Sequence, residues 1–529
     1  MTKVKGYAKG VALLTMAALF VKVLSMVYRV PFQNLVGDQG FFIYQQVYPF
    51  VAVFMTWTSS GLAIAVSKMI ADELGQPLKR QQAISQLLYR ALWVFSILLF
   101  IGMYSASDFF ARAMGDEQLG FLLKIGSLVI FTVPTLSMYK GKLQAHGNLQ
   151  TVAVMQVIEQ VVRVTVILGG TAYVMATSQS LYTAGAVAVL GTVSGEWIGV
   201  LLLMLYMRKK RQSIYLLNKE NTVVRKREFL KKMLVVSISA SMSSLLLIFF
   251  QIVDAFTVFD TLVQYIEQPI DAMKEKGIYD RGQPLVQVGL VIATSFSMAI
   301  VPMIASAMKK RKGEQMRQLI RVTFQATLLF GVAATVGLML VMPYLNKALF
   351  ETADLSDVLS VYVIQIIMLS MIMAITAILQ GLGYRKGPTY ILAISLLIKI
   401  LITKPFVHYF GIVGAAWSSN LALIVGACSL VYYLKKKQDI QLASRLFYQI
   451  TGYATVCMVF VVGGIRIFDE ILAIDSRLYA AIMMLFLVII GGSIFILCIT
   501  RYRIFTVKEW LLLPLGSKMA ALQLFLNRK

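Results

Sequence analysis

The chain has 529 residues, of which 58% are hydrophobic and 14% are charged, and its net charge is +25. A soluble protein of this length could not bury so much apolar surface, and apolar runs of about 20 residues recur that could cross a hydrocarbon core of roughly 30 Å as helices. The composition therefore excludes a soluble protein and predicts an all-α polytopic membrane protein; a β-barrel would show short alternating segments instead.

Fourteen apolar runs are expected to span the membrane. In chain order they cover residues 10–31, 41–66, 87–107, 119–139, 151–175, 182–207, 233–257, 285–308, 321–345, 358–382, 388–407, 411–434, 447–468 and 478–500. The first run is too long and too polar at its centre for a signal peptide, so we expect it to be retained. Basic residues gather in the N-terminus, in the connections after even-numbered runs and in the C-terminus, which predicts that both termini are cytoplasmic. The positive charge is thus a topology signal, and no nucleic-acid partner is expected.

Two halves of the chain resemble each other. Residues 181–210 and 410–437 both have a short stretch with Gly and Ala near their start, continue apolar and end in Tyr and a basic cluster. In addition, "LQAHGN" at 143–148 resembles "LQGLGY" at 379–384. Repeats of six spans are parallel, and such repeats commonly rock against each other around a site between them. The expected domains are an N-lobe (1–210), a basic cytoplasmic linker (211–232), a C-lobe (233–437), two extra spans (438–505) and a cytoplasmic amphipathic tail (506–529).

Several apolar runs contain charged residues, each of which costs roughly 2.5–3.5 kcal/mol at the centre of a bilayer on insertion scales. Lys22 and Arg29 lie two turns apart on one helix face, and Gln156, Glu159 and Arg163 form a polar face in the fifth span. Glu159 is expected to pair with Arg163, four residues later. The other candidate binding residues are Lys68, Asp254 and Lys399.

These polar faces are expected to line a central cavity whose surplus of cations suits an anionic ligand such as pyrophosphate. Simpler explanations stay open. Glu159 and Arg163 could form a structural pair, Lys22 could snorkel to the surface and Lys68 could anchor a helix end. Arg29 and Lys399 could cap carbonyl groups or bind lipid head groups.

No motif indicates a bound cofactor. The three cysteines lie within apolar runs, the two histidines are far apart, and no P-loop or metal-ligand spacing is present. We therefore expect no metal, no cofactor and no ATP-driven pump. A membrane glycosyltransferase would need acids in a large outer loop, and we interpret the acidic connection 258–284, which contains Asp271 and also Arg281, as a short solvated loop.

Four stretches, taken in order, resemble a known family. They are "SSGLAIAVSKMIADE" (59–73), "QVIEQVVRV" (156–164), "ATSFSMAIVP" (293–302) and "LQGLGYRKGP" (379–388). They are similar to bacterial polysaccharide-export proteins of the MurJ and stage V sporulation protein B type, in the multidrug/oligosaccharidyl-lipid/polysaccharide (MOP) exporter superfamily. The resemblance implies a V-shaped fold of two lobes, a cavity arginine at Arg29 and a lipid-tail groove at the last two spans. Ala63 departs from the proline that the family often has there.

The resemblance and the polar faces together predict a flippase of the bacterial cytoplasmic membrane that is not an enzyme. We expect it to translocate an undecaprenyl-pyrophosphate-linked glycan, with the peptidoglycan precursor lipid II as first choice, by alternating access and as a monomer. The expected partners are that lipid-linked glycan, membrane lipids and the cell-wall synthesis machinery. The alternatives are a MATE-type drug/cation antiporter, which usually needs a buried acid, and the glycosyltransferase.

Overall fold

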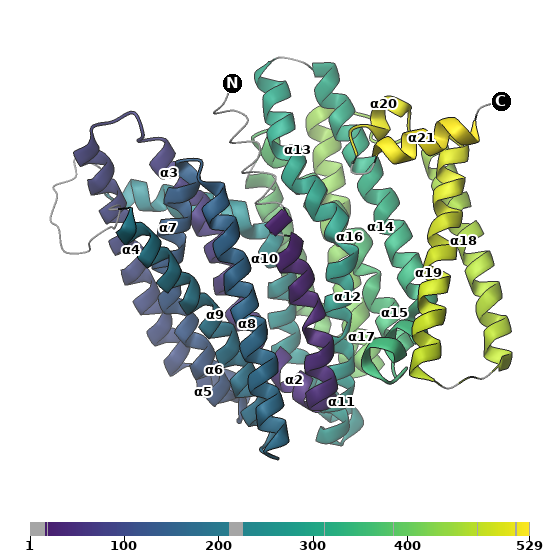
Figure 1. The fold of residues 1–529 in the computed structure, drawn as a ribbon, viewed down its shortest axis with the longest axis horizontal. Helices are drawn as coiled ribbons and strands as arrows, with labels where there is room; N and C mark the ends of the chain where they lie inside the picture. Colours follow the sequence, from purple (N-terminus) through teal and green to yellow (C-terminus); the bar gives the residue numbers. More distant parts are fainter. Residues whose placement is uncertain are drawn as a thin grey trace. The chain divides into compact units, whose positions relative to one another are not determined.

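The computed structural model describes residues 16–17, 19–210, 226–310, 313–384, 386–472, 474, 476–513 and 516–527. These residues are almost entirely helical and contain no β-strand, which confirms the all-α prediction (Figure 1). The chain divides into two compact units. The first contains Met1–Asp280 and Ile400–Gly411, and the second contains Arg281–Lys399 and Ile412–Lys529. The sequence-based lobes stay a prediction, and most of the basic linker, residues 211–225, lies outside the described residues.

The first unit is built from helices that pack along their lengths. They are α2 (Arg29–Thr56), the π-helical turn η1 (Trp57–Leu62), α3 (Ala63–Ala71), α4 (Leu78–Ser105), α5 (Ser107–Ala113), α6 (Leu119–Ser127), the 3₁₀ turn η2 (Leu128–Thr132), α7 (Val133–Ala145), α8 (Leu149–Ala176), α9 (Leu181–Lys209), α10 (Lys226–Ile266) and α11 (Pro269–Asp280). Side-chain caps start α8 and α9, where Asn148 and Ser180 accept hydrogen bonds from the backbone N–H groups of Thr151 and Thr183.

The second unit contains the remaining helices, except that the Ile400–Gly411 part of α17 belongs to the first unit. They are α12 (Gly282–Gly289), α13 (Val291–Lys309), α14 (Gly313–Phe350), α15 (Ser356–Val363), α16 (Gln365–Gly381), α17 (Lys386–Gln438), α18 (Arg445–Leu472), α19 (Arg477–Arg501), α20 (Val507–Trp510) and α21 (Gly516–Leu526). The short helices α20 and α21, in yellow in Figure 1, share a hydrophobic core with α14, α18 and α19. The buried Trp510 indole donates a hydrogen bond to the Gln523 amide oxygen at 2.7 Å, so this part of the predicted tail is a folded cap.

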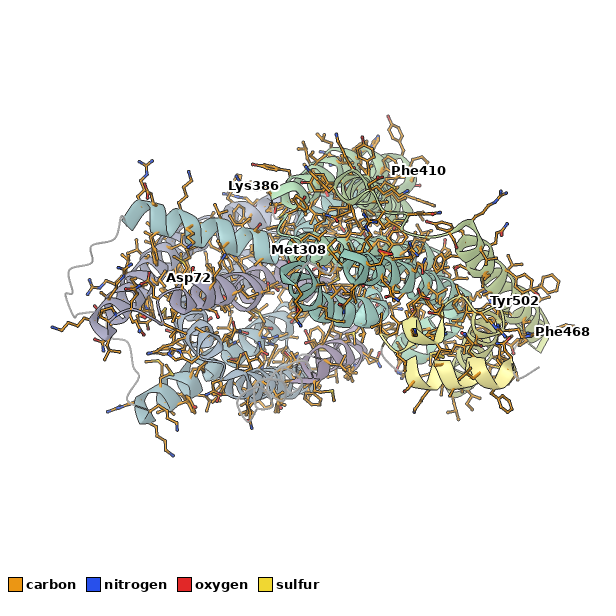
Figure 2. The ribbon with its side chains drawn as sticks, turned by 90° about the horizontal axis from the view of Figure 1, so that it is seen from above. Asp72, Met308, Lys386, Phe410, Phe468 and Tyr502 are labelled. Atoms are coloured by element: carbon orange, nitrogen blue, oxygen red, sulfur yellow. The ribbon has the colours of Figure 1, made fainter. Side chains whose placement is uncertain are left out.

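Eleven helices of the described residues are long and apolar enough to cross a membrane. Large apolar side chains project from these helices, as Phe410 and Phe468 do in Figure 2, which is typical of a lipid-facing surface. The described residues of the fourteen expected spans fall on helices apart from single turn residues such as Ala106 and Leu290; residues 10–15 and 18 of the first span lie outside the described residues. The count of fourteen crossings stays a prediction.

Two of the eleven helices, Leu19–Ala71 and Lys386–Gln438, have 53 residues each and contain two expected spans each. Each is interrupted at a glycine with positive φ, Gly37 at 67° and Gly411 at 58°. The hydroxyls of Tyr28 and Tyr44 are 3.0 Å apart, although 16 residues of straight helix would separate them by roughly 24 Å. The chain therefore reverses at Gly37, and we call the two halves around it the Gly37 hairpin.

The connection 258–284 is not the solvated loop that we expected. α10 continues to Ile266 and α11 follows at once, with Lys276 and Tyr279 only 2% and 1% exposed. α11 packs against α2 so closely that a Cβ on Gly277 would lie 2.2 Å from the carbonyl oxygen of Asp38. The charged residues suggested a solvated loop, but Lys276 pairs with Asp280 one turn later in the same helix, and this pairing allows both to be enclosed.

This close approach gives a test of how α11 is held. We expect Gly277→Ala to lower the free energy of unfolding by about 1–3 kcal/mol, because overpacking forces the backbones apart. The measurement is the thermal unfolding midpoint of the purified protein in detergent. The matched control is Gly452→Ala in α18, where the added methyl would meet nothing within 4 Å. Equal midpoints for the two variants would contradict a fixed α11.

Candidate functional site

Arg29 lies inside the first unit with only 1% of its surface exposed. Its guanidinium is 4.9 Å from the ring centroid of Tyr48, in the other half of the Gly37 hairpin. Nearby, the Tyr28 and Tyr44 hydroxyls are 3.0 Å apart, and Tyr44 reaches Thr192 on α9 at 3.2 Å. The attraction between a cation and an aromatic face strengthens when both are desolvated, so this tyrosine wall stabilises a permanent positive charge inside the protein.

Acidic and basic groups of α10 and α11 surround the same region. The Tyr279 hydroxyl donates a hydrogen bond to Asp254 Oδ2 at 3.0 Å, and Lys276 Nζ lies 2.6 Å from Asp280 Oδ1. Burial raises the pKa of the Asp280 carboxyl. The positive charges of Lys276 and Arg29 act to lower this pKa, and the negative charge of Asp254 acts to raise it further. Because α11 packs against α2, and Tyr279 of α11 bonds to Asp254 of α10, we treat these residues as one site. We call it the α2–α11 cluster; it is formed by Arg29, Tyr48, Asp254, Lys276, Tyr279 and Asp280.

A second buried group of charges joins α7, α8 and α9. Lys140 Nζ lies 2.8 Å from Glu159 Oε2, and Arg163 Nη2 lies 2.8 Å from Glu196 Oε1. Arg163 also donates a hydrogen bond to the Gln160 amide oxygen at 3.0 Å. We call Lys140, Glu159, Arg163 and Glu196 the α7–α9 tetrad; its two cations and two acids balance each other.

The expected pair between Glu159 and Arg163 is therefore wrong. Although the two residues are one turn apart on α8, each side chain bonds to a neighbouring helix instead, and Glu196, whose role the sequence left open, is the acid that neutralises Arg163. Glycines on α9 make room for this arrangement, because a Cβ on Gly199 would lie 2.2 Å from Glu159 Oε1. The tetrad contributes no surplus charge for binding an anion.

Two further cations are buried in the second unit. Lys399 has no exposed surface and donates hydrogen bonds to Ser418 and Ser419 at 3.1 and 2.7 Å, across the reversal in α17. Arg281 is also buried; it donates to Asn346 at 2.7 Å and to Thr352 at 3.0 Å. Arg281 lies in the connection between α11 and α12, as expected, but it is buried and not solvated.

The remaining candidates lie at the edges of these groups. Lys22, Lys68 and Gln156 are half-buried, in the first half of the Gly37 hairpin, in α3 and in α8. Among the described contacts, neither Lys68 nor Gln156 joins the α2–α11 cluster or the α7–α9 tetrad. The common cavity predicted from the sequence stays a prediction.

The residues that the sequence missed are tyrosines and cations at helix ends. Lys140 follows the expected fourth span by one residue, whereas α7 continues to Ala145 and encloses it. The next turn also contains Lys142 and Gln144, so the composition gave no reason to extend the span past Lys140. No sequence signal distinguishes Tyr28, Tyr44 and Tyr48 from other aromatic residues of an apolar helix.

Comparison with known proteins places this fold among transporters of one superfamily. Residues 7–308 match the polysaccharide biosynthesis protein family, and residues 277–403 match the MatE family. The membrane protein YabM of Bacillus subtilis (strain 168) is 32% identical over 512 residues, covering 97% of this chain and 96% of YabM. The lipid II flippase MurJ of the same organism is 24% identical over 521 residues, covering 93% and 94% of the two chains.

A solved structure of the lipid II flippase MurJ in an inward-closed conformation has the same fold, with a TM-score of 0.67 at 16% identity, covering 92% of this chain and 98% of that one. The chain is thus a multi-pass membrane protein of the MOP fold. It belongs to the polysaccharide biosynthesis protein family, the MurJ and stage V sporulation protein B type of the MOP superfamily.

Proposed function

We propose that this chain is a flippase that moves an undecaprenyl-pyrophosphate-linked glycan across the bacterial cytoplasmic membrane, and that lipid II is its substrate. The observation that carries the proposal is Arg29, a guanidinium buried inside a membrane protein against a wall of tyrosines. Its forked donors match the oxygens of a pyrophosphate, and its charge persists at every physiological pH. The similarity to proteins named lipid II flippase supports the choice of substrate.

The rest of the α2–α11 cluster suits a ligand that must bind and then leave. Lys276 adds a second cation, which is paired with Asp280 at 2.6 Å. An incoming pyrophosphate would compete with this carboxylate for Lys276. Competition of this kind limits the net binding energy, so the head group is not trapped in the protein.

In this proposal the polyprenyl tail stays in the lipid along α18 and α19 while the head group crosses by alternating access. Outward movement of a negative head is favoured by the inside-negative membrane potential, by about 2.3 kcal/mol for each charge that crosses 100 mV. Flipping is therefore expected to slow when the potential is collapsed.

Complementation tests the proposal. A bacterial host depleted of its own lipid II flippases would express this chain, and growth and outer-leaflet lipid II would be measured. We expect the wild-type chain to restore both. If a chain present in the membrane at normal levels restores neither, lipid II is not the substrate, and the same assay with other undecaprenyl-pyrophosphate glycans decides whether the broader proposal stands.

Two variants distinguish the flippase from the two alternative functions, the glycosyltransferase and the antiporter. A glycosyltransferase that uses acids of α11 would lose activity with Asp271→Asn, whereas the flippase should keep it, because Asp271 is half-exposed and lies 3.7 Å from Lys274. An antiporter would exchange a cationic dye against H⁺ or Na⁺ in vesicles and lose this exchange with Asp254→Asn. Dye exchange without lipid II movement would overturn the proposal.

A further inference from the structure

A small pocket lies among helix ends of the second unit. It measures about 280 Å³ and is lined by Ala307, Met308, Gly313, Met316, Leu382, Tyr384 and Gln438, from the ends of α13, α16 and α17 and the start of α14 (Figure 2 labels Met308). Most of this lining is apolar. The volume is just below the roughly 300–1,000 Å³ of sites for drug-sized ligands, which suits part of an acyl chain better than a sugar.

One lysine is held at the rim of this pocket. Lys437 Nζ lies 5.6 Å from the ring centroid of Tyr384 and 5.8 Å from that of Tyr433, and the two rings meet edge to face. The start of α17 accommodates this arrangement through Gly387, whose Cβ would lie 2.4 Å from Tyr433 Cζ. Lys437 is exposed and has no ion pair with the described residues, so its ammonium group is available to an external anion.

The surroundings of the pocket are basic. Exposed cations stand at the same helix ends, and Glu314 and Asp439 are the acids nearest to the lining residues in sequence; the cations are Lys310, Arg317, Lys386, Lys435 and Lys436. The predicted topology puts these ends on the cytoplasmic side, where anionic lipids give the leaflet its negative surface potential. Basic pockets between membrane helices on this side bind phosphate head groups.

We propose that this pocket binds an anionic phospholipid of the cytoplasmic leaflet. The lipid phosphate accepts hydrogen bonds from the Lys437 ammonium, which Tyr384 and Tyr433 hold in place, and the upper part of an acyl chain lies between Met308 and Leu382. This site is separate from the one proposed for the transported head group, so either proposal can fail without the other.

The test compares two lysines of one basic run. Purified full-length protein in detergent would be titrated with phosphatidylglycerol and with phosphatidylcholine, and the thermal unfolding midpoint recorded. We expect phosphatidylglycerol to raise the midpoint of the wild type more than phosphatidylcholine does, and Lys437→Gln to remove at least half of that difference. The matched control, Lys435→Gln, and the conservative variant Lys437→Arg should keep it.

Two more arms identify the ligand. Met308→Trp fills the pocket without a change of charge and should weaken the response to phosphatidylglycerol. Glycerol 3-phosphate, which has the phosphate but no acyl chain, should produce no shift. Native mass spectrometry would count bound lipids for any variant whose midpoint without lipid differs from the wild type.

Three results would overturn the proposal. Equal losses in Lys437→Gln and Lys435→Gln would indicate general attraction to a basic surface. A full response to glycerol 3-phosphate would indicate a soluble phosphate ligand. An unchanged lipid response in both Lys437→Gln and Met308→Trp would show that the pocket holds no lipid.

Discussion

Arg29→Ala is expected to abolish growth of a host that depends on this chain for flippase activity, and to lower outer-leaflet lipid II at least about tenfold. Hydrogen bonds to charged groups are worth roughly 1.5–3 kcal/mol, and each 1.4 kcal/mol corresponds to about a factor of ten. Alanine removes both the charge and the forked donors. Arg29→Lys keeps the charge without the fork, so its flux should lie between those of Arg29→Ala and the wild type.

The matched control for this prediction is Arg80→Ala. Arg80 is an exposed arginine of the same unit, paired with Glu73 at 2.9 Å, and its removal should leave flux unchanged. Tyr48→Leu gives a second comparison, because it keeps an apolar side chain but removes the ring below Arg29. Normal growth and flux with Arg29→Ala, at wild-type levels in the membrane, would exclude Arg29 as the group that holds the pyrophosphate.

The second large effect concerns stability. Lys140→Met should lower the free energy of unfolding by roughly 3–5 kcal/mol, because it leaves Glu159 buried without its cation, and breaking a buried ion pair from one side costs about that much. The measurement is the thermal unfolding midpoint in detergent, together with the fraction of protein that reaches the membrane.

A double variant separates charge balance from packing. Lys140→Met with Glu159→Met replaces the whole pair by apolar side chains of similar length, which is often neutral or stabilising for a buried ion pair. We therefore expect the double variant to recover most of the stability that Lys140→Met loses. If the double variant is as unstable as Lys140→Met alone, the pair stabilises the protein by something other than mutual neutralisation.

Hydropathy predicted the helices well because each membrane helix satisfies its own backbone hydrogen bonds, so its position depends on local composition. The same method could not say where a helix ends. Lys140 and Arg281 were assigned to connections, yet both are buried. A charge at the end of an apolar run has the same hydropathy whether it reaches water or a partner inside the fold.

The sequence could not predict which buried charged side chains pair with one another. Spacing along α8 made Arg163 a reasonable partner for Glu159, but neighbours on other helices, Lys140 and Glu196, offered contacts in a better position. The burial of Arg29, in contrast, was expected from its place in an apolar run. Its contact with Tyr48 depends on the reversal of the chain at Gly37, which the periodicity of apolar residues does not predict.

The Gly37 hairpin has a consequence for how the chain enters the membrane during synthesis. A lone helix that carries an arginine inserts less well than an apolar one, because the translocon exposes each segment to lipid as it leaves the ribosome. Here the second half of the hairpin carries Tyr48, the ring that covers Arg29, so the two halves shield the charge when they leave the translocon together. Alanine at position 37 would meet no atom within 4 Å, yet it disfavours the backbone at φ 67°. We therefore expect Gly37→Ala to disturb the reversal, and with it the shielding of Arg29 during insertion.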